Sequence, residues 1–238
     1  MLETDASSML APGYFSGVPC GLARSASCLL MFSGGRDSAL AAVRLCKMGM
    51  SPALITIVAG HLVGINRVKT RLAELRPYLP PGSQWVLVKQ PAELKTDTTF
   101  YDRTCLPCQH AYVVAAVGLA AKAEVKKVAF GYVSYQNHWP EQTPFAIARL
   151  QAVLRGHGME LLLPVQDLLS RESALQELKS LGLSVESLEQ KCIRQVTNVT
   201  LSSEKLAEQV ALWENAINQS ILAMPHIDIE ILEHQVIG

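Results

Sequence analysis

The chain has 238 residues, of which 49% are hydrophobic and 18% are charged, so it can bury a large core and is not expected to be disordered throughout. The 21 basic and 21 acidic residues balance to a formal charge of zero, which argues against a protein that binds nucleic acid mainly through phosphate contacts. No apolar run approaches the ~20 residues of a membrane helix, and the polar start MLETDASSML lacks the pattern of a signal peptide, so we expect a cytoplasmic protein without a membrane partner.

From Cys28 onward, strand-like and helix-like patterns alternate, after an irregular arm over residues 1–27. Short apolar runs such as CLLMF predict buried strands, and apolar residues at helical spacing predict helices. The expected strands are 28–32, 53–58, 85–88, 127–133 and 159–165, and the expected helices are 38–48, 63–79, a segment after Pro107, 145–156, 171–181 and 203–222. The tail HIDIEILEH alternates Ile with acidic residues, which predicts an edge strand or a dimer arm.

This alternation predicts an α/β fold with a doubly wound, mostly parallel five-stranded sheet and helices on both faces. The arm 1–27 would precede a sheet domain over residues 28–195. A C-terminal extension over residues 196–238 would contribute one helix and one strand.

The stretch SGGRDS, from Ser33 to Ser38, lies between the first expected strand and the first expected helix. In open parallel sheets, ligands bind outside the carboxyl ends of the strands. Gly34 and Gly35 let backbone N–H groups approach a ligand without a Cβ in the way, and the helix start offers free N–H groups to an anion. Asp37 can cap the helix or hold a Mg²⁺ that bridges phosphates. We therefore predict a phosphate site here; an ordinary strand–helix turn is the alternative.

SGGRDS resembles the PP-loop of the N-type ATP pyrophosphatases, which bind ATP on an adenine-nucleotide α-hydrolase-like fold. These enzymes join AMP to a substrate oxygen and release pyrophosphate, and a nucleophile then displaces the AMP. The resemblance implies that ATP and Mg²⁺ are the cofactors. It also implies that the pyrophosphate is held by Ser33, Gly34, Gly35, Asp37 and Ser38, with Arg36 at the variable position.

Further segments are similar to the 7-cyano-7-deazaguanine synthases, over residues 29–195. Gly60 and His61 match a stretch after the second strand of that family, Trp139-Pro140-Glu141 stands where it has Tyr-Pro-Asp, and Ser170-Arg171-Glu172 stands where it has Ser-Lys-Glu. The similarity implies an enzyme that adenylates a carboxylate or amide oxygen of a deazapurine-like substrate, for displacement by an amine or ammonia. Modification of a macromolecule or anti-phage defence would be its setting.

The chain departs from that family at the cysteines, because only Cys192 lies near the C-terminus, where the family has a four-cysteine zinc site. Cys105 and Cys108 form a CxxC at a helix start, where two thiolates can reach one metal. Together with Cys192 they resemble the three-cysteine iron–sulfur site of PP-loop tRNA thiolases, which implies Zn²⁺ or a 4Fe-4S cluster, with His110 as a further ligand. A redox pair, or two small residues without a special role, are the alternatives.

The loop SYQNHWPEQ follows the fourth expected strand, at the same end of the sheet as the PP-loop. We expect its side chains to contact substrate, although a solvated loop is the alternative. The expected substrate residues are Gln136, Asn137, His138 and Glu141 in this loop, with Gln109 and His110 before it. Asp37, Glu141 as a general base and Arg171 at a phosphate form the expected catalytic set, and Gly60 and His61 are expected near the adenine or ribose.

The leading hypothesis is therefore an ATP-dependent, AMP-forming synthase of the 7-cyano-7-deazaguanine type, acting on a small molecule. A tRNA thiolase that uses sulfur as the nucleophile is an alternative, although the neutral charge makes tRNA the less favoured substrate. A non-catalytic nucleotide-binding subunit with a protein partner is another. A homodimer is expected in the enzyme hypotheses.

Overall fold

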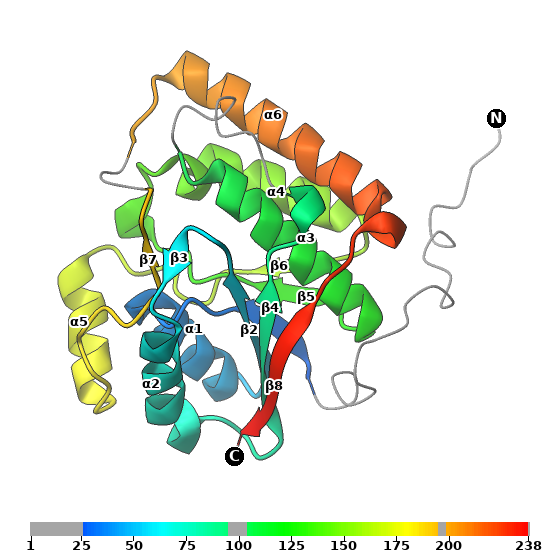
Figure 1. Ribbon diagram of the computed structural model, residues 1–238. Coiled ribbons are helices and arrows are strands. Elements are labelled where there is room, and N and C mark those ends of the chain that lie inside the picture. The colour runs from blue at the N-terminus through cyan, green and yellow to red at the C-terminus, as the bar shows by residue number, and fades with distance from the viewer. Residues whose placement is uncertain (1–25, 95–103, 195–198, 238) are drawn as a thin grey trace.

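The computed structural model describes residues 26–94, 104–194 and 199–237, so the predicted arm 1–27 lies almost wholly outside the described residues. Its centre is a six-stranded sheet in the order β6-β5-β1-β2-β4-β8 (Figure 1). The strands of this sheet are β1 (Cys28–Met31), β2 (Pro52–Val58), β4 (Ser83–Lys89), β5 (Lys127–Ala129), β6 (Glu160–Leu162) and β8 (Ile231–Ile237). All neighbours pair in parallel except β8, which runs antiparallel to β4.

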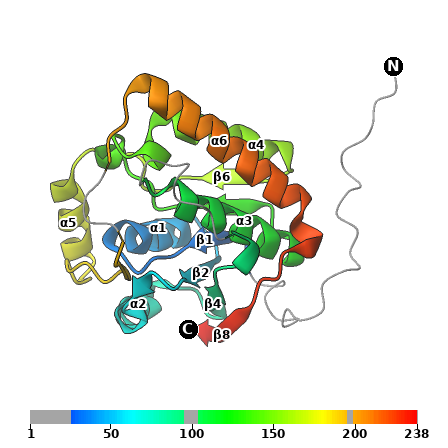
Figure 2. The same cartoon turned by 45° about the horizontal axis from the view of Figure 1, so that its top comes forward.

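Helices cover both faces of this sheet, as Figure 2 shows. The helices are α1 (Arg36–Lys47), α2 (Ile65–Leu75), α3 (Leu106–Lys122), α4 (Pro144–Gly156), α5 (Arg171–Ser180) and α6 (Ser203–Leu222). One face packs against α3, α4 and α6, and the other packs against α1, α2 and α5. The expected α/β fold with a mostly parallel sheet is therefore confirmed.

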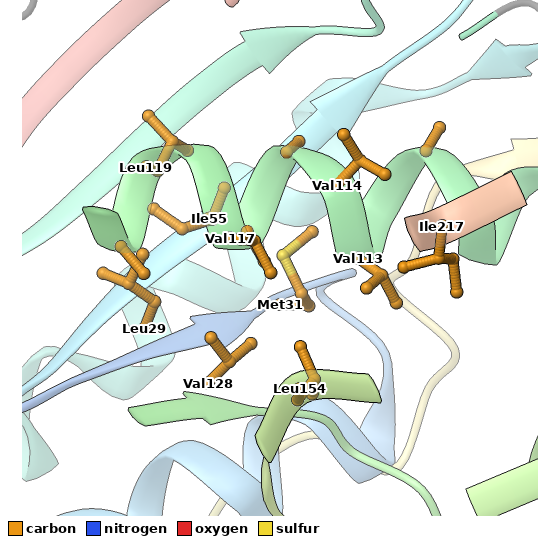
Figure 3. Close-up of a cluster of buried hydrophobic side chains, with 14 of the residues drawn as sticks. Leu29, Met31, Ile55, Val113, Val114, Val117, Leu119, Val128, Leu154 and Ile217 are labelled. Carbon is orange, nitrogen blue, oxygen red and sulfur yellow. The ribbon is translucent and has the colours of Figure 1, made fainter. Parts of the chain in front are cut away.

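The first core cluster lies between the sheet and α3, α4 and α6 (Figure 3). Leu29 and Met31 of β1 point into this cluster, where they meet Val117 of α3. Leu30, between them, points to the other face and packs with Leu40 of α1. Because successive strand residues alternate between faces, a strand covered on both sides has to be continuously apolar, as CLLMF is.

The segment predicted as one helix over residues 63–79 differs in the structure. It begins with the short strand β3 (Leu62–Val63), which pairs with β7 (Lys191–Cys192) in a separate two-stranded ribbon. Gly64 then adopts a left-handed conformation with φ +93°, and α2 starts only after it. The helix ends at Leu75, and a short 3₁₀ turn containing Pro77 follows, because proline cannot continue the helical hydrogen bonds.

The C-terminal helix and strand join the main sheet domain. α6 packs on α3 and α4, and β8 adds an antiparallel edge to β4, so the sheet has six strands where the sequence predicted five. The tail is thus an edge strand, although its pairing begins at Ile231 and not at His226. Within the described ranges, no helix has the length and apolar character that a membrane crossing requires.

Candidate functional site

A pocket of about 910 Å³ opens at the carboxyl ends of β1, β2 and β5. The PP-loop forms its floor, together with Thr56 and Ile57 at the end of β2. Its walls come from the start of α3, the loop 130–142 and the segment 187–192. The strand ends therefore bring together the loops that the sequence marked as functional, as expected for an open parallel sheet.

The PP-loop turn is shaped by its glycines and locked by its two serines. Gly34 has φ +80°, and a Cβ there would lie 2.9 Å from the Val68 Cα, so only glycine fits. The Ser33 Oγ accepts a hydrogen bond from the Gly35 N–H at 3.2 Å, and the Ser38 Oγ donates to the Gly35 carbonyl at 3.1 Å. Gly35 is the N-cap of α1, and no side chain caps this helix start. The N–H groups at the start of α1 are therefore available to an anion. An ordinary strand–helix turn would be expected to have a side-chain cap at this position.

Asp37 lines the pocket in the first turn of α1 and does not cap the helix. Its Oδ1 accepts a 2.5 Å hydrogen bond from the hydroxyl of Tyr135, a residue that the sequence did not single out. Burial raises the pKa of Asp37, while the Tyr135 hydroxyl and the Arg36 and Arg171 guanidinium groups act in the opposite direction. Arg171, at the start of α5, lines the same pocket. The structure thus brings Asp37, Arg36 and Arg171 together.

The segment 184–192, in which the sequence marked only Cys192, closes one side of the pocket. Arginines of the helices hold its backbone: the Arg36 Nε donates to the Val185 carbonyl at 2.8 Å, and an Arg71 Nη donates to the Glu186 carbonyl at 2.8 Å. Arg71 has no exposed side-chain surface, and its Nε also donates to the Gly34 carbonyl at 3.3 Å. This arrangement places the side chains of Ser187, Glu189, Gln190, Lys191 and Cys192 in the pocket wall.

The three predicted metal ligands converge near this wall. Burial, together with the neighbouring Cys108, Cys105 and Cys192 thiols, raises the pKa of Tyr112, which lines the pocket. Burial also raises the pKa of Cys108 to about 11, so its thiol is protonated at neutral pH in the absence of a metal. Among the residues that the structure describes, no three His, Cys, Asp or Glu side chains are arranged to hold one metal ion. Metal binding by Cys105, Cys108 and Cys192 therefore stays a prediction, which rests on the proximity of the three thiols to Tyr112.

His61 and Gly60 differ from their predicted positions near a nucleotide. The His61 Nε2 lies 3.3 Å from the Cys108 Sγ, and the ring does not line the pocket. Burial and the nearby Arg194 lower the pKa of His61. Gly60 is exposed in the turn after β2 and is likewise absent from the pocket wall. The structure therefore relates His61 to the cysteines and not to the PP-loop.

His110, predicted as a substrate residue or further metal ligand, faces away from the pocket. It is buried against α6, where its Nε2 lies 2.9 Å from the Ser220 Oγ. The reason is helical geometry: His110 follows Cys108 by two residues, and about 100° per residue places the two side chains on opposite sides of α3.

The remaining predicted substrate residues divide between the pocket wall and other positions. Gln109, Gln136 and His138 line the pocket. Asn137 is exposed outside it, and Glu141 is buried beneath the loop with 2% of its surface accessible. Burial raises the pKa of Glu141 to about 7, so the group can gain or lose a proton near neutral pH, but Glu141 does not line the pocket.

No protein-family model and no curated protein matches this sequence. Among solved structures, a 4-thiouridine synthetase in complex with RNA and bound ATP is similar, with a TM-score of 0.56 and 17% identity over 87% of this chain. The chain spans 55% of that protein's length. The NMN synthetase from Francisella tularensis has a TM-score of 0.49 at 12% identity, over 83% of this chain and 87% of its own. A U34-tRNA thiolase from Methanococcus maripaludis with its 4Fe-4S cluster has a TM-score of 0.48 at 13% identity, over 88% and 74%. The chain thus shares the α/β fold of the 4-thiouridine synthetase.

Proposed function

We propose that this protein is an ATP-dependent adenylating enzyme, which joins AMP to a substrate oxygen and releases pyrophosphate. The observation that carries the proposal is the uncapped start of α1, behind Gly34 and Gly35, at the floor of a 910 Å³ pocket. Free N–H groups at a helix start are a ready site for phosphate oxygens. The fold shared with a synthetase that has bound ATP agrees with this site.

Each polar group of the loop has a task in this reaction. The free N–H groups of α1 and the Ser33 hydroxyl bind the leaving pyrophosphate, while Arg36 and Arg171 offset its charge. Asp37 has the oxygen ligands that Mg²⁺ prefers, and that ion supplies charge neutralisation when bound. Tyr135 holds the Asp37 carboxylate in place.

The test is calorimetric titration with α,β-methylene-ATP, which cannot release pyrophosphate. Ser33→Ala removes a hydroxyl that shapes the loop and is expected to weaken binding about tenfold, the effect of one lost charge-assisted hydrogen bond. Ser180→Ala, at the far end of α5, is the matched control and should bind like the wild type. Equal affinities for all three proteins would contradict the proposal.

For the second half-reaction, the cysteines favour sulfur as the nucleophile. A hydrosulfide ion would attack the carbon that carries the adenylated oxygen: a C–S bond forms, the C–O bond breaks, and AMP leaves with both bonding electrons and the oxygen. Cys105, Cys108 and Cys192 are the thiolates that would hold a 4Fe-4S cluster, and all three lie near Tyr112 at the pocket. In the described residues their side chains are not yet arranged around one metal position, so cluster binding would have to draw them together. Such a cluster, when bound, supplies an iron that can carry sulfide.

Metal analysis after anaerobic purification tests this assignment. We expect iron and acid-labile sulfide in the wild type and their loss in Cys105→Ser. Cys46→Ser is the matched control, because Cys46 lies in α1, away from the pocket wall, and should keep the cluster. Stoichiometric zinc without iron would instead support a structural metal site and count against sulfur transfer.

A deazapurine-type substrate with ammonia as nucleophile is the second candidate, favoured by the carboxamides of Gln109 and Gln136 in the pocket wall. AMP formation is measured with 7-carboxy-7-deazaguanine and ammonium, and in parallel with tRNA and sulfide. Turnover in the first reaction alone selects the deazapurine synthase, and turnover in the second alone selects the thiolase. ATP binding without AMP formation in either would leave a nucleotide-binding subunit.

A further inference from the structure

Two hydrogen bonds, the first of them buried, fix the orientation of the Gln136 carboxamide in the pocket wall. The Gln142 Oε1 accepts from the backbone N–H of Val133 at 3.0 Å. Because a backbone N–H can only donate, the oxygen of Gln142 has to face it. The Gln142 Nε2 then donates to the Gln136 Oε1 at 2.9 Å. The Gln136 oxygen is thereby occupied, and its Nε2, a donor, remains for the pocket.

Gln109, on α3, is oriented in the same sense. Its Oε1 accepts from the Tyr132 hydroxyl at 2.8 Å. Tyr132 is 4% exposed, and burial raises its pKa far above neutrality, so the hydroxyl keeps its proton and needs an acceptor. Gln109 therefore also presents its Nε2. Two neutral N–H donors, from α3 and from the loop after β5, line one pocket.

The pocket wall near these donors is partly aromatic. Trp139 lines the same pocket, while its Nε1 is buried away from the pocket space. Tyr112 adds an aromatic wall beside which a flat ring can pack.

The charges nearby distinguish a neutral ligand from an anionic one. The cationic Arg36 and Arg171 belong to the PP-loop part of the pocket, next to Asp37. The carboxyl group of Glu141 acts on Tyr132, the partner of Gln109, and raises the pKa of that hydroxyl further. Burial raises the pKa of Glu141 itself to about 7, so the group is partly ionised at neutral pH. A carboxylate ligand at the donors would be repelled by it, whereas a neutral carbonyl would not.

We propose that Gln109 and Gln136 bind the second substrate through carbonyl oxygens of a neutral planar heterocycle, and reject an analogue with an amino group in that place. The inference rests on the proposed function, because this ligand is the acceptor of AMP. It names the substrate class of the site: a ring carbonyl of the lactam type. An amino group placed opposite a Gln Nε2 would leave both donors without an acceptor, and this cost allows the site to discriminate strongly against the amino analogue.

The test uses two matched pairs of ligands that differ by a carbonyl or an amino group: uridine against cytidine, and hypoxanthine against adenine. Calorimetric affinities are measured with α,β-methylene-ATP saturating the nucleotide site. We expect the carbonyl member of at least one pair to bind about tenfold more tightly than its amino partner, as for one unsatisfied hydrogen bond. Equal affinities within both pairs would overturn the inference.

Gln136→Glu is the decisive variant, because the carboxylate keeps an oxygen for Gln142 and replaces only the pocket-facing donor by an acceptor. The preference should then reverse in favour of the amino ligand. Gln109→Glu makes the same exchange on the other wall and serves if Gln136→Glu does not fold. Gln151→Glu adds the same charge on the exposed face of α4, and should keep the wild-type preference. An unchanged preference in both pocket variants would overturn the inference.

The α,β-methylene-ATP titration comes first, so that two failures remain distinct. Wild-type protein that does not bind the nucleotide would overturn the proposed function itself. Normal nucleotide binding without discrimination between carbonyl and amino ligands would overturn only the assignment of Gln109 and Gln136.

Discussion

Gly131 is the residue whose substitution tests most directly how the PP-loop is positioned. It follows β5 and packs against the first turn of α1, although no motif in the sequence marks it. An added Cβ would lie 2.9 Å from the Ser38 N, 3.0 Å from the Ser38 Cα and 3.1 Å from the Asp37 carbonyl carbon. All three atoms are backbone, so no side chain can move aside.

The expected magnitude follows from this overlap. Ordinary van der Waals contact begins at 3.4 Å, so the start of α1 has to retreat by about 0.5 Å in Gly131→Ala. Overpacking of this kind costs about 1–3 kcal/mol, which lowers the Tm of a chain of this size by roughly 2–12 °C. The displaced N–H groups should also weaken α,β-methylene-ATP binding by about tenfold or more.

Thermal unfolding by circular dichroism and calorimetric titration measure the two effects. Gly156→Ala is the matched control: Gly156 ends α4, and a Cβ there would meet nothing within 4 Å. It should leave nucleotide affinity unchanged and, if anything, raise the Tm, because alanine favours the helix. If Gly131→Ala has the Tm and the affinity of the wild type, the close packing of β5 against the PP-loop does not position it.

Three further predictions follow from buried polar groups. The pKa of Glu141 rises from 4.5 to about 7 on folding, so the free energy of unfolding of the wild type falls by roughly 3 kcal/mol between those pH values. In urea unfolding, Glu141→Gln should therefore be as stable as the wild type at pH 4.5 and more stable at pH 8. The same stability difference at both pH values would refute this. Arg71→Met leaves the Gly34 carbonyl and the other partners of Arg71 unpaired, and should lower the free energy of unfolding by about 3–5 kcal/mol in the same assay. A loss below about 1 kcal/mol would show that water replaces the guanidinium. Tyr135→Phe should raise the Mg²⁺ concentration needed for half-maximal AMP formation with little change in Tm, because Asp37 loses its 2.5 Å donor; an unchanged Mg²⁺ requirement would contradict that role.

The sequence predicted those parts of the fold whose signal is local. CLLMF predicted β1 because both faces of that strand are buried, which demands an unbroken apolar run. SGGRDS predicted the turn before α1 because the left-handed φ of Gly34 suits glycine and few other residues. Neither inference needed knowledge of what lies across the fold.

Features that depend on distant partners could not be predicted in this way. The segment 184–192 has no periodic pattern, and its place in the pocket wall depends on arginines of α1 and α2 that lie 115 or more residues earlier. The strand β3 forms only because Leu62 meets Cys192 at the same end of the sheet. The orientation of His110 toward α6, in contrast, could have been predicted from the sequence, since two residues of helix rotate a side chain by about 200°.

The arginine contacts to the segment 184–192 also set an order on folding. Closing this side of the pocket requires the chain to join Arg36 to Val185 and Arg71 to Glu186, across 149 and 115 residues. Contacts between such distant residues form slowly, because the entropy of closing a long loop has to be offset first. The proposed capacity to bind ATP should therefore emerge late during refolding, after the β1–α1–β2 unit that contains the PP-loop has formed. A nucleotide that binds only the completed pocket would stabilise the native state by an amount that grows with the logarithm of its concentration above Kd. Saturation with ATP would then report that the distant segments, and not the motif alone, have reached their native arrangement.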